Sequence, residues 1–340
     1  MAANLLSLLK VGKYVLRNRI VLPPMQADLA TEEGLATEAH VKHYGRYARW
    51  CGLVIVEHTA VSPEGRYSRK QLGIWSDKHI PGLAKIAKAV HDEGGVVVIQ
   101  LNHAGGKASR EVTNSSPKAP SSVPLEFYPE TPRELSLDEI ESIIRKFGEA
   151  AERAYSAELD GVEIHGAHGF LLSQFWSPIT NRRKDDYGGS LENRMRLPLE
   201  IVREVRDRLP RDFLLLYRLG VTDLRDDGVK VEESIVFAKK LEKEGVDIID
   251  VSGGLCGSRP KELEGVQGYF IPYAHEVKKN TNIPIIGGGG IRDPLVADKF
   301  IREGKVDLVY VGRAQLEDPE WARKAIEILK NKYSQFSSQG

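Results

Sequence analysis

Short apolar runs alternate with amphipathic helical stretches along almost the whole chain, and this alternation limits the fold more than any other feature. Most runs are apolar at consecutive positions, which is typical of parallel strands covered on both faces. Eight runs are expected to form strands: Ile20–Leu22, Leu53–Val56, Val96–Leu101, Gly161–Ile164, Phe213–Tyr217, Ile248–Val251, Ile283–Ile286 and Leu308–Val311. The eight helices expected to follow them are Glu38–Arg49, Pro81–Glu93, Leu137–Glu158, Leu191–Arg208, Glu232–Glu244, Ile271–Lys279, Pro294–Arg302 and Pro319–Lys330.

Eight strands, each followed by a helix, predict a (β/α)8 TIM barrel in which residues 1–340 form a single domain. Crossovers of this length favour parallel pairing. A doubly wound sheet is the alternative, but the first strand is not followed by the glycine-rich dinucleotide fingerprint of that fold. Two expected loops, Asn102–Ser136 and Gly166–Ser190, are unusually long. Both follow strands at the carboxyl-terminal side, where barrel active sites form.

The charges are balanced, with 48 Lys and Arg against 48 Asp and Glu, which argues against a nucleic-acid or anionic-membrane binder. Cys51 and Cys256 cannot build a disulfide framework and suit a reducing compartment. The opening MAANLLSLLK lacks the basic region and cleavage site of a signal peptide. No run approaches the roughly 20 apolar residues of a membrane span. We therefore expect a cytoplasmic protein.

Two histidines stand three residues apart where the fourth expected strand, VEIH, ends. His165 and His168 begin a loop that carries a dense polar string from Asn181 to Arg194. Side chains at the carboxyl end of a strand, where the loop begins, often point to ligands, and buried polar groups there need hydrogen-bond partners. Both histidines are ordinary loop residues in one alternative and a metal pair in another, but no third ligand of matching spacing lies nearby. The pattern instead predicts a site that binds an oxygen atom, without a metal.

A glycine run after the seventh strand indicates an anion site. Gly287–Gly290 precede the segment Ile291–Pro294, which begins a helix, and the eighth strand ends in Val311–Arg313. Barrels often bind phosphate at the loops after strands seven and eight, through bare backbone N–H groups and a helix N-terminus. Glycine lets the backbone approach the anion, and Arg313 is suited to pair with it bidentately. The alternative is a tight barrel turn without a ligand.

Further segments stand at strand ends or in the two long loops: Asn18–Ile20, Pro23–Met25, Ile99–Gly105, EIHGAHGFLL and Asn181–Arg194, with Arg218, Ser252, Gly289, Gly290, Gly312 and Arg313. Together they resemble the Old Yellow Enzyme family of FMN-dependent oxidoreductases, from about Leu8 to Leu329. The most specific part is N-x-R-x-D-x-Y-G-G-S-x-x-N-R, matched at every fixed position. The compact single-barrel branch fits best. Larger relatives add an iron–sulfur cluster and a second flavin domain, whereas this chain stops soon after the eighth helix and lacks the cysteines.

The resemblance implies noncovalent FMN over the barrel mouth, its phosphate toward strands seven and eight. Arg218 would place a cation near the flavin pyrimidine and stabilise the anionic reduced form. The alternative for Arg218 is a salt bridge at the barrel rim with a residue such as Asp223. The residues implied to bind FMN are Pro23, Pro24, Met25 and Gln26 along the ring, Ala60 and Gln100 at its pyrimidine edge, and His165, Arg218, Ser252, Gly289, Gly290, Gly312 and Arg313.

The resemblance also implies a reaction. His165 and His168 would donate hydrogen bonds to the carbonyl oxygen of an α,β-unsaturated substrate, while hydride from reduced flavin adds to the β-carbon. NADPH or NADH would first reduce the flavin in the same pocket, which gives ping-pong kinetics. Relatives of this kind form a homodimer or homotetramer, and the same is expected here.

The chain departs from the family around the reacting centre. Phe170 stands where relatives commonly have the tyrosine that supplies the α-carbon proton. Gln26 replaces a cysteine or threonine, Asp28 replaces a tyrosine of the pocket, and Gly106 replaces an arginine. Drift in a tolerant pocket is one explanation, and a different substrate, larger or cationic, is the other. The expected substrate-binding residues are Asp28, His165, His168 and Phe170.

Two other functions remain open. One is an FMN-dependent dehydrogenase or dienoyl-thioester reductase that uses the same scaffold on another substrate class. The other is a phosphate-binding barrel without redox chemistry, such as an aldolase or isomerase. The second would need a lysine or a carboxylate base at a strand end, whereas strand five ends in Arg218 and strand six in Ser252–Gly254.

Overall fold

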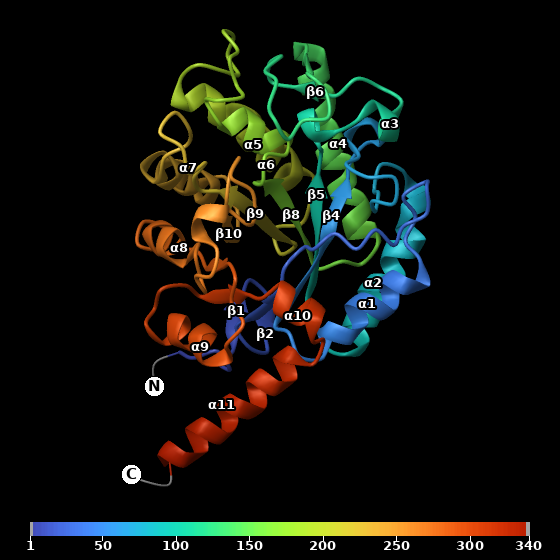
Figure 1. Cartoon of the computed structure of the whole chain (residues 1–340). Coiled ribbons are helices and arrows are strands. Elements are labelled where there is room, and N and C mark those ends of the chain that lie inside the picture. Colours follow the sequence, from blue (N-terminus) through green and yellow to red (C-terminus); the bar gives the residue numbers. More distant parts are fainter. Residues whose placement is uncertain (1–2, 338–340) are drawn as a thin grey trace.

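The barrel predicted from the sequence is present, because eight parallel strands pair into a closed ring (Figure 1). The computed structural model describes residues 3–337. The order around the ring is β10-β11-β12-β3-β4-β5-β8-β9, so the first and last barrel strands of the sequence pair and close it. The barrel strands are β3 (Ile20–Leu22), β4 (Leu53–Ala60), β5 (Val97–Asn102), β8 (Gly161–Gly166), β9 (Leu214–Gly220), β10 (Ile248–Ser252), β11 (Ile285–Gly288) and β12 (Leu308–Tyr310).

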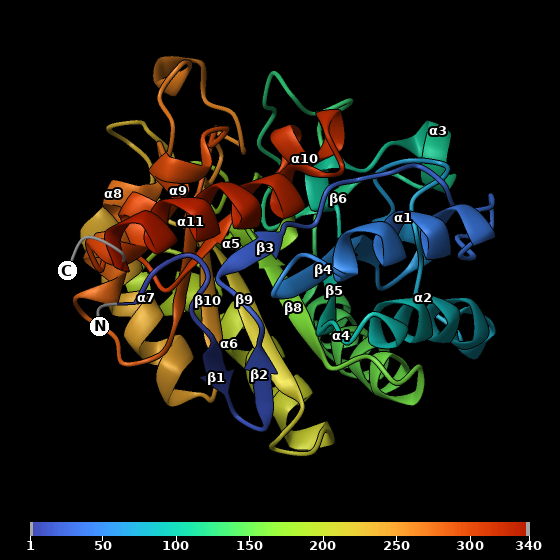
Figure 2. The same cartoon turned by 90° about the horizontal axis from the view of Figure 1, so that it is seen from below.

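The long helices surround the barrel, as Figures 1 and 2 show. They are α1 (Glu38–Ala48), α2 (Ile80–Asp92), α4 (Leu137–Ser156), α6 (Leu191–Arg208), α7 (Val231–Lys243), α8 (Ile271–Lys278), α9 (Pro294–Arg302) and α11 (Trp321–Ser337). The sequence did not predict the short helices α3 (Arg110–Thr113), α5 (Leu171–Trp176) and α10 (Arg313–Glu317). Within residues 3–337, no helix combines the length and apolar character needed to cross a bilayer.

Strand β4 is longer than its apolar run. The expected strand ended at Val56 because the next three residues, Glu57, His58 and Thr59, are polar, yet β4 continues through all of them to Ala60. Glu57 is buried and accepts hydrogen bonds from the Tyr44 hydroxyl and the Ala27 N–H. The pairing with β5 shifts register between Val56 and Thr59. Such irregularities re-aim side chains near sites, and here the shifted stretch contains His58, which lines the central cavity.

A hairpin closes the amino-terminal end of the barrel. It consists of β1 (Leu9–Val11) and β2 (Tyr14–Leu16), which pair antiparallel, and the view from below shows it beneath the barrel (Figure 2). Val11 and Leu16 are buried in one apolar cluster with residues from the barrel strands, such as Val21. The amino-terminal end of the barrel is therefore packed core, and the site lies at the opposite end, where the strands end.

Candidate active site

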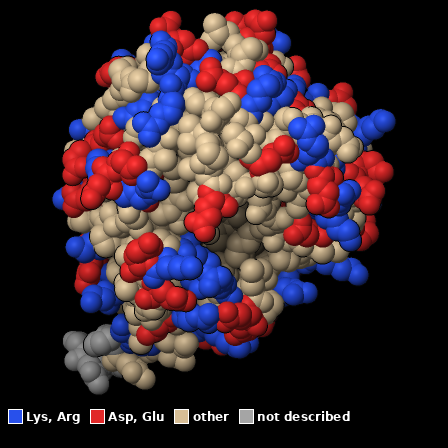
Figure 3. All heavy atoms as spheres, turned by 45° about the horizontal axis from the view of Figure 1, so that its top comes forward, with Lys and Arg blue, Asp and Glu red and all other residues tan. Residues whose placement is uncertain are grey.

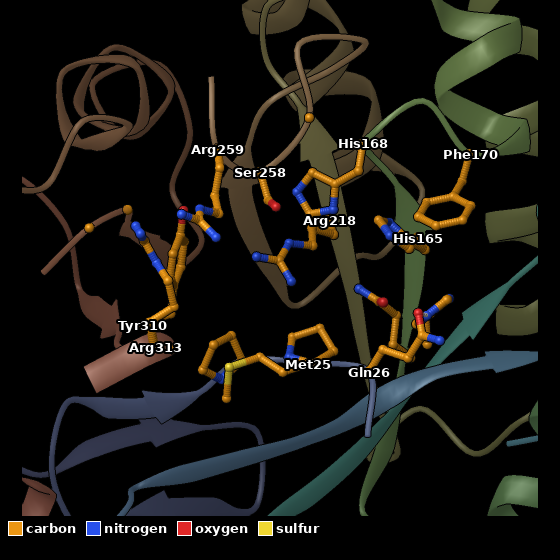
Figure 4. A pocket seen from close by; sticks show the side chains of 18 of the residues that line it. Met25, Gln26, His165, His168, Phe170, Arg218, Ser258, Arg259, Tyr310 and Arg313 are labelled. Atoms are coloured by element: carbon orange, nitrogen blue, oxygen red, sulfur yellow. Dashed lines mark hydrogen bonds between the residues drawn. The ribbon is translucent and has the colours of Figure 1, made fainter. Parts of the chain in front are cut away.

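A cavity of about 450 Å³ lies at the carboxyl-terminal mouth of the barrel. Figure 3 shows a hollow in this face, with Lys and Arg side chains gathered along one side of it. Most of the predicted site residues line the cavity, as Figure 4 shows for several of them. They are Pro23, Pro24, Met25, Gln26, Gln100, His165, His168, Phe170, Arg218, Gly289, Gly290, Gly312 and Arg313.

Three predicted residues are not part of this lining. Ala60 is fully buried, and its backbone pairs with the segment around Gly73. The Ser252 hydroxyl lies 2.7 Å from Nε2 of His168, so it contacts the histidine from outside the cavity. The Asp28 carboxylate accepts hydrogen bonds from Gln26 and from Ser68. Ser252 and Asp28 therefore position lining residues, and neither forms the wall itself.

One end of the cavity is built to receive an anion. Gly289 and Gly290 have φ values of +101° and +66°, and an added Cβ would lie 2.4 and 2.9 Å from the Tyr269 ring. Only glycine fits there, so the backbone can approach a ligand closely. Arg313, the first residue of α10, forms no ion pair within residues 3–337, whereas Arg292 is held by Glu317 at 2.5 and 2.8 Å. The Arg313 guanidinium interacts with the Tyr269 hydroxyl and has no carboxylate partner among the described residues, so its charge beside bare backbone fits the phosphate of FMN.

The other end suits a flat, polar-edged ring. Pro23, Pro24 and Met25 follow β3 and line the cavity, and Met25 lies opposite His168 (Figure 4). Gln100 and Arg218 bring amide and guanidinium groups to the cavity from β5 and β9. These groups match the carbonyl and N–H edge of a flavin pyrimidine. The residues present therefore fit FMN at both ends of the cavity.

Arg218 is paired, but not with the residue that the sequence suggested. Asp223 accepts hydrogen bonds from the Ser177 hydroxyl and from two backbone N–H groups, and it does not pair with Arg218. The partner is Asp250 on β10, directly opposite in the strand register, with Nε and Oδ2 3.2 Å apart. Asp223 is not the partner because it lies in the loop after β9. Inside the barrel, the partner of Arg218 is set by the register with the neighbouring strand.

Two buried carboxylates lie beside this arginine. Glu163 accepts a hydrogen bond of 2.8 Å from the amide of Gln100, and its second oxygen has no hydrogen-bond partner in the described chain. Burial raises the pKa of Glu163, and the charge of Asp250 raises it further. Burial also raises the pKa of Asp250, while Arg218 opposes this. The signal that sequence reasoning missed was a charged residue in the middle of each apolar strand, VEIH and IIDV.

The rings of His165 and His168 lie next to each other in the cavity wall, with centroids 5.1 Å apart. Burial lowers the pKa of both imidazoles well below the ordinary value, and the neighbouring Arg218 adds to the effect. Both rings are therefore neutral at physiological pH. Nδ1 of His165 accepts from the N–H of Ala167 at 3.3 Å, which places its proton on Nε2, where it can be donated to a ligand.

The polar string after these histidines is structural, which corrects its interpretation as part of the oxygen site. No residue from Asn181 to Arg194 lines the cavity. The Asn181 amide donates to two carbonyl groups, and Arg183 pairs with Asp185 at 2.6 Å. Ser190 caps α6 through the N–H of Asn193. These side chains fold their own loop and fix the helices beside the site.

Several lining residues were not predicted. His58 and Tyr310 reach the cavity from strands β4 and β12. The others come from loops whose paths no periodicity defines, and those with polar side chains include Tyr67, Lys107, Ser258, Arg259 and Tyr269. Lys107 lies in the first long loop, which was expected to be functional, but its sequence neighbours gave no sign of its direction. Burial lowers the pKa of this amine to about 8.

Acid is expected to weaken the fold partly through His58. Burial lowers the pKa of His58 to about 4, whereas the unfolded imidazole titrates near about 6.5. Below about pH 6.5 the unfolded chain therefore binds a proton at this residue that the folded chain does not bind. The free energy of unfolding consequently falls by about 2 kcal/mol between pH 7 and pH 5. Urea unfolding at both pH values should show a smaller loss, by about that amount, in His58→Gln. Equal losses in the two proteins would contradict the assignment.

The chain was compared with known proteins. The sequence model of the NADH:flavin oxidoreductase / NADH oxidase family matches residues 4–332. An NADH oxidase from Thermoanaerobacter brockii is 44% identical over 334 residues; these cover 96% of this chain and 51% of that protein, so the chain spans about half its length. An NADPH dehydrogenase from Bacillus subtilis strain 168 is 38% identical over 331 residues, which cover 97% and 96% of the two chains.

Solved structures agree with this relationship. A 2-naphthoyl-CoA reductase in complex with 2-naphthoyl-CoA superimposes with a TM-score of 0.88 at 28% identity, covering 95% of this chain and 52% of that one. An Old Yellow Enzyme homologue from Zymomonas mobilis gives a TM-score of 0.84 at 28% identity, covering 95% and 92%. The resemblance found in the sequence is thereby confirmed. The chain belongs to the NADH:flavin oxidoreductase / NADH oxidase family and is an FMN-dependent NAD(P)H oxidoreductase of the Old Yellow Enzyme type.

Proposed function

We propose that this protein reduces the C=C bond of α,β-unsaturated carbonyl compounds, with NADPH or NADH as reductant and with His165 and His168 holding the substrate oxygen. One observation carries the proposal: two buried, neutral imidazoles lie 5.1 Å apart in the wall of the cavity that accommodates FMN. Neutral imidazoles donate hydrogen bonds without carrying a charge that would have to be desolvated.

FMN, when bound, supplies the hydride and accepts its replacement from the nicotinamide. The residues of the chain do the rest. His165 and His168 stabilise the negative charge that develops on the oxygen, which is worth a few kcal/mol for each donor. Ser252 fixes the ring of His168 through the contact at Nε2. The Phe170 ring lies tilted against the His165 ring, with centroids 4.9 Å apart, and forms an apolar wall that excludes water from the reacting carbons.

A thioester substrate is the second candidate, and a specific feature favours it. A groove of about 720 Å³ adjoins the cavity and shares Arg259, Tyr269 and Arg313 with it. Lys261 adds a further positive charge to this groove, and Glu264 is the carboxylate in its lining. A coenzyme A tail carries several phosphate groups, so a basic groove at the edge of the site suits it. The structural similarity to a reductase solved with 2-naphthoyl-CoA supports the same candidate.

A visible spectrum and a substrate panel test these candidates. The purified protein is expected to be yellow, with flavin bands near about 375 and 450 nm. NADPH oxidation is then measured with 2-cyclohexenone, N-ethylmaleimide and a dienoyl-CoA. Turnover of cyclohexenone supports enone reduction, and turnover of the dienoyl-CoA alone supports the thioester reductase. A colourless protein that cannot be reconstituted with FMN would contradict both.

A further inference from the structure

An unpaired amine lies in the wall of the active-site cavity. Lys107 follows β5, and its Nζ donates a hydrogen bond of 2.9 Å to the backbone oxygen of His168. The amine lies over the Phe170 ring, 4.5 Å from the centroid, with the rings of Phe127 and Tyr67 at 5.5 and 5.8 Å. In the part of the chain that the structure describes, Lys107 forms no ion pair. A largely buried cation without a counter-ion is costly and points to a role in the site.

The proposed reaction needs a proton at the α-carbon of the substrate, and the residues around that carbon supply few candidates. Phe170 has no proton to give. The N–H groups of His165 and His168 are directed to the substrate oxygen in the proposed function. Arg218 keeps its protons at all relevant pH values, because the guanidinium cannot be deprotonated in proteins. His58 also lies near Phe170, with ring centroids 5.2 Å apart, but burial lowers the pKa of His58 to about 4, so its ring is neutral and is a poor proton donor. The remaining groups with a transferable proton near Phe170 are the ammonium of Lys107 and the hydroxyl of Tyr67, whose ring centroid is 5.5 Å from that of Phe170.

We propose that Lys107 is the acid that protonates the α-carbon, in place of the hydroxyl that Phe170 lacks. The proposal rests on the proposed function. Two electrons and a hydrogen arrive as hydride at the β-carbon, the C=C π pair forms the new C–H bond at the α-carbon with a proton from the ammonium, and Lys107 is left as a neutral amine. The amine regains a proton from water before the next turnover.

The surroundings of Lys107 suit this exchange. The titratable groups that face it are the imidazoles of His58, His165 and His168 and the phenol of Tyr67, and none of them is a carboxylate. Burial lowers the pKa of Lys107 to about 8, so the amine is charged at pH 7 and releases its proton more readily than an exposed lysine. An acid with a pKa near the working pH is the most effective general acid.

Two variants separate proton transfer from charge. Lys107→Met removes both the charge and the proton, whereas Lys107→Arg keeps the charge, the stacking on Phe170 and a donor for His168, but gives up no proton. The holoenzyme is reduced anaerobically, and its reoxidation is followed by stopped-flow absorbance with 2-cyclohexenone and with N-ethylmaleimide. Both variants are expected to slow the cyclohexenone reaction by ~10²-fold, because general acid catalysis contributes about 10²–10⁴-fold. The maleimide reaction, whose product enolate water protonates easily, should change little.

Further readouts distinguish a chemical role from a structural one. In the wild type the cyclohexenone rate should fall above about pH 8, and this break should vanish in Lys107→Met. The Cε signal of Lys107 in ¹³C-lysine-labelled protein, assigned by its loss in Lys107→Arg, should titrate at the same pH. Adding Phe170→Tyr to Lys107→Met should restore at least ~10-fold of the lost rate by supplying a hydroxyl.

The outcomes are decisive in both directions. A Lys107→Arg variant as fast as wild type would overturn the proposal, because a fixed cation would then suffice. A matching loss in Tyr67→Phe, with Lys107→Met unaffected, would assign the proton to Tyr67. Failure of the proposed function looks different, since the wild-type flavin would then be reoxidised by neither acceptor.

Discussion

Replacing His165 and His168 together by alanine is expected to slow enone reduction by about 10⁴-fold while FMN stays bound. In the proposed reaction each imidazole donates an N–H to an oxygen that becomes negative as hydride arrives, and removal of one such donor typically costs about 10²–10³-fold. FMN should remain because the phosphate site expected at Gly289, Gly290 and Arg313 does not include the histidines, and Arg313 lies at the other side of the cavity from His165 (Figure 4). Stopped-flow reoxidation by 2-cyclohexenone measures the rate, and the flavin absorbance measures occupancy.

Phenol binding supplies an independent check on this pair. Phenols that stack on oxidised flavin place their oxygen where the substrate carbonyl would lie, and they give a long-wavelength charge-transfer band. The double variant should lose this band, and each single variant should weaken it. Unchanged phenol affinity in the double variant would mean that His165 and His168 are structural and that the oxygen site lies elsewhere in the cavity.

The second large effect is expected for Arg313→Ala, which should weaken FMN binding by about 10²-fold. Arg313 forms no ion pair within the described chain and interacts only with the neutral Tyr269, so its charge is available to the phosphate. A charge-assisted contact of this kind contributes about 1.5–3 kcal/mol. Fluorescence titration of apoprotein with FMN measures the loss. Arg292→Ala is the matched control, because Arg292 lines the same cavity but is held by Glu317. Equal losses in the two variants would contradict the assignment.

The site residues that could be predicted are those that lie close in sequence to the carboxyl end of a barrel strand. Gly289, Gly290 and Arg313 directly follow the seventh and eighth strands, so the barrel prediction alone brings them together. His165 lies near the end of the fourth barrel strand, β8, and His168 follows this strand by two residues. Once the periodicity defines eight strands, the carboxyl ends of all of them meet at one rim.

Contacts that depend on register or on loop paths could not be predicted. Arg218 meets Asp250 because the two residues are opposite each other in β9 and β10, and a shift of one residue would have turned them to different faces. Lys107 and Tyr67 reach the cavity from loops without periodicity. The string from Asn181 to Arg194 misled because polar side chains can satisfy the backbone of their own loop as well as a ligand.

The hairpin of β1 and β2 has a consequence for how the two reactants are used. Since Val11 and Leu16 are packed into the core at the amino-terminal end, the reductant and the electron acceptor both reach the cofactor from the opposite end. Two molecules that enter through the same opening and bind in the same pocket cannot be bound at the same time. Either reactant in large excess should therefore occupy the wrong redox state of the enzyme and inhibit it, and raising the concentration of the other should relieve the inhibition.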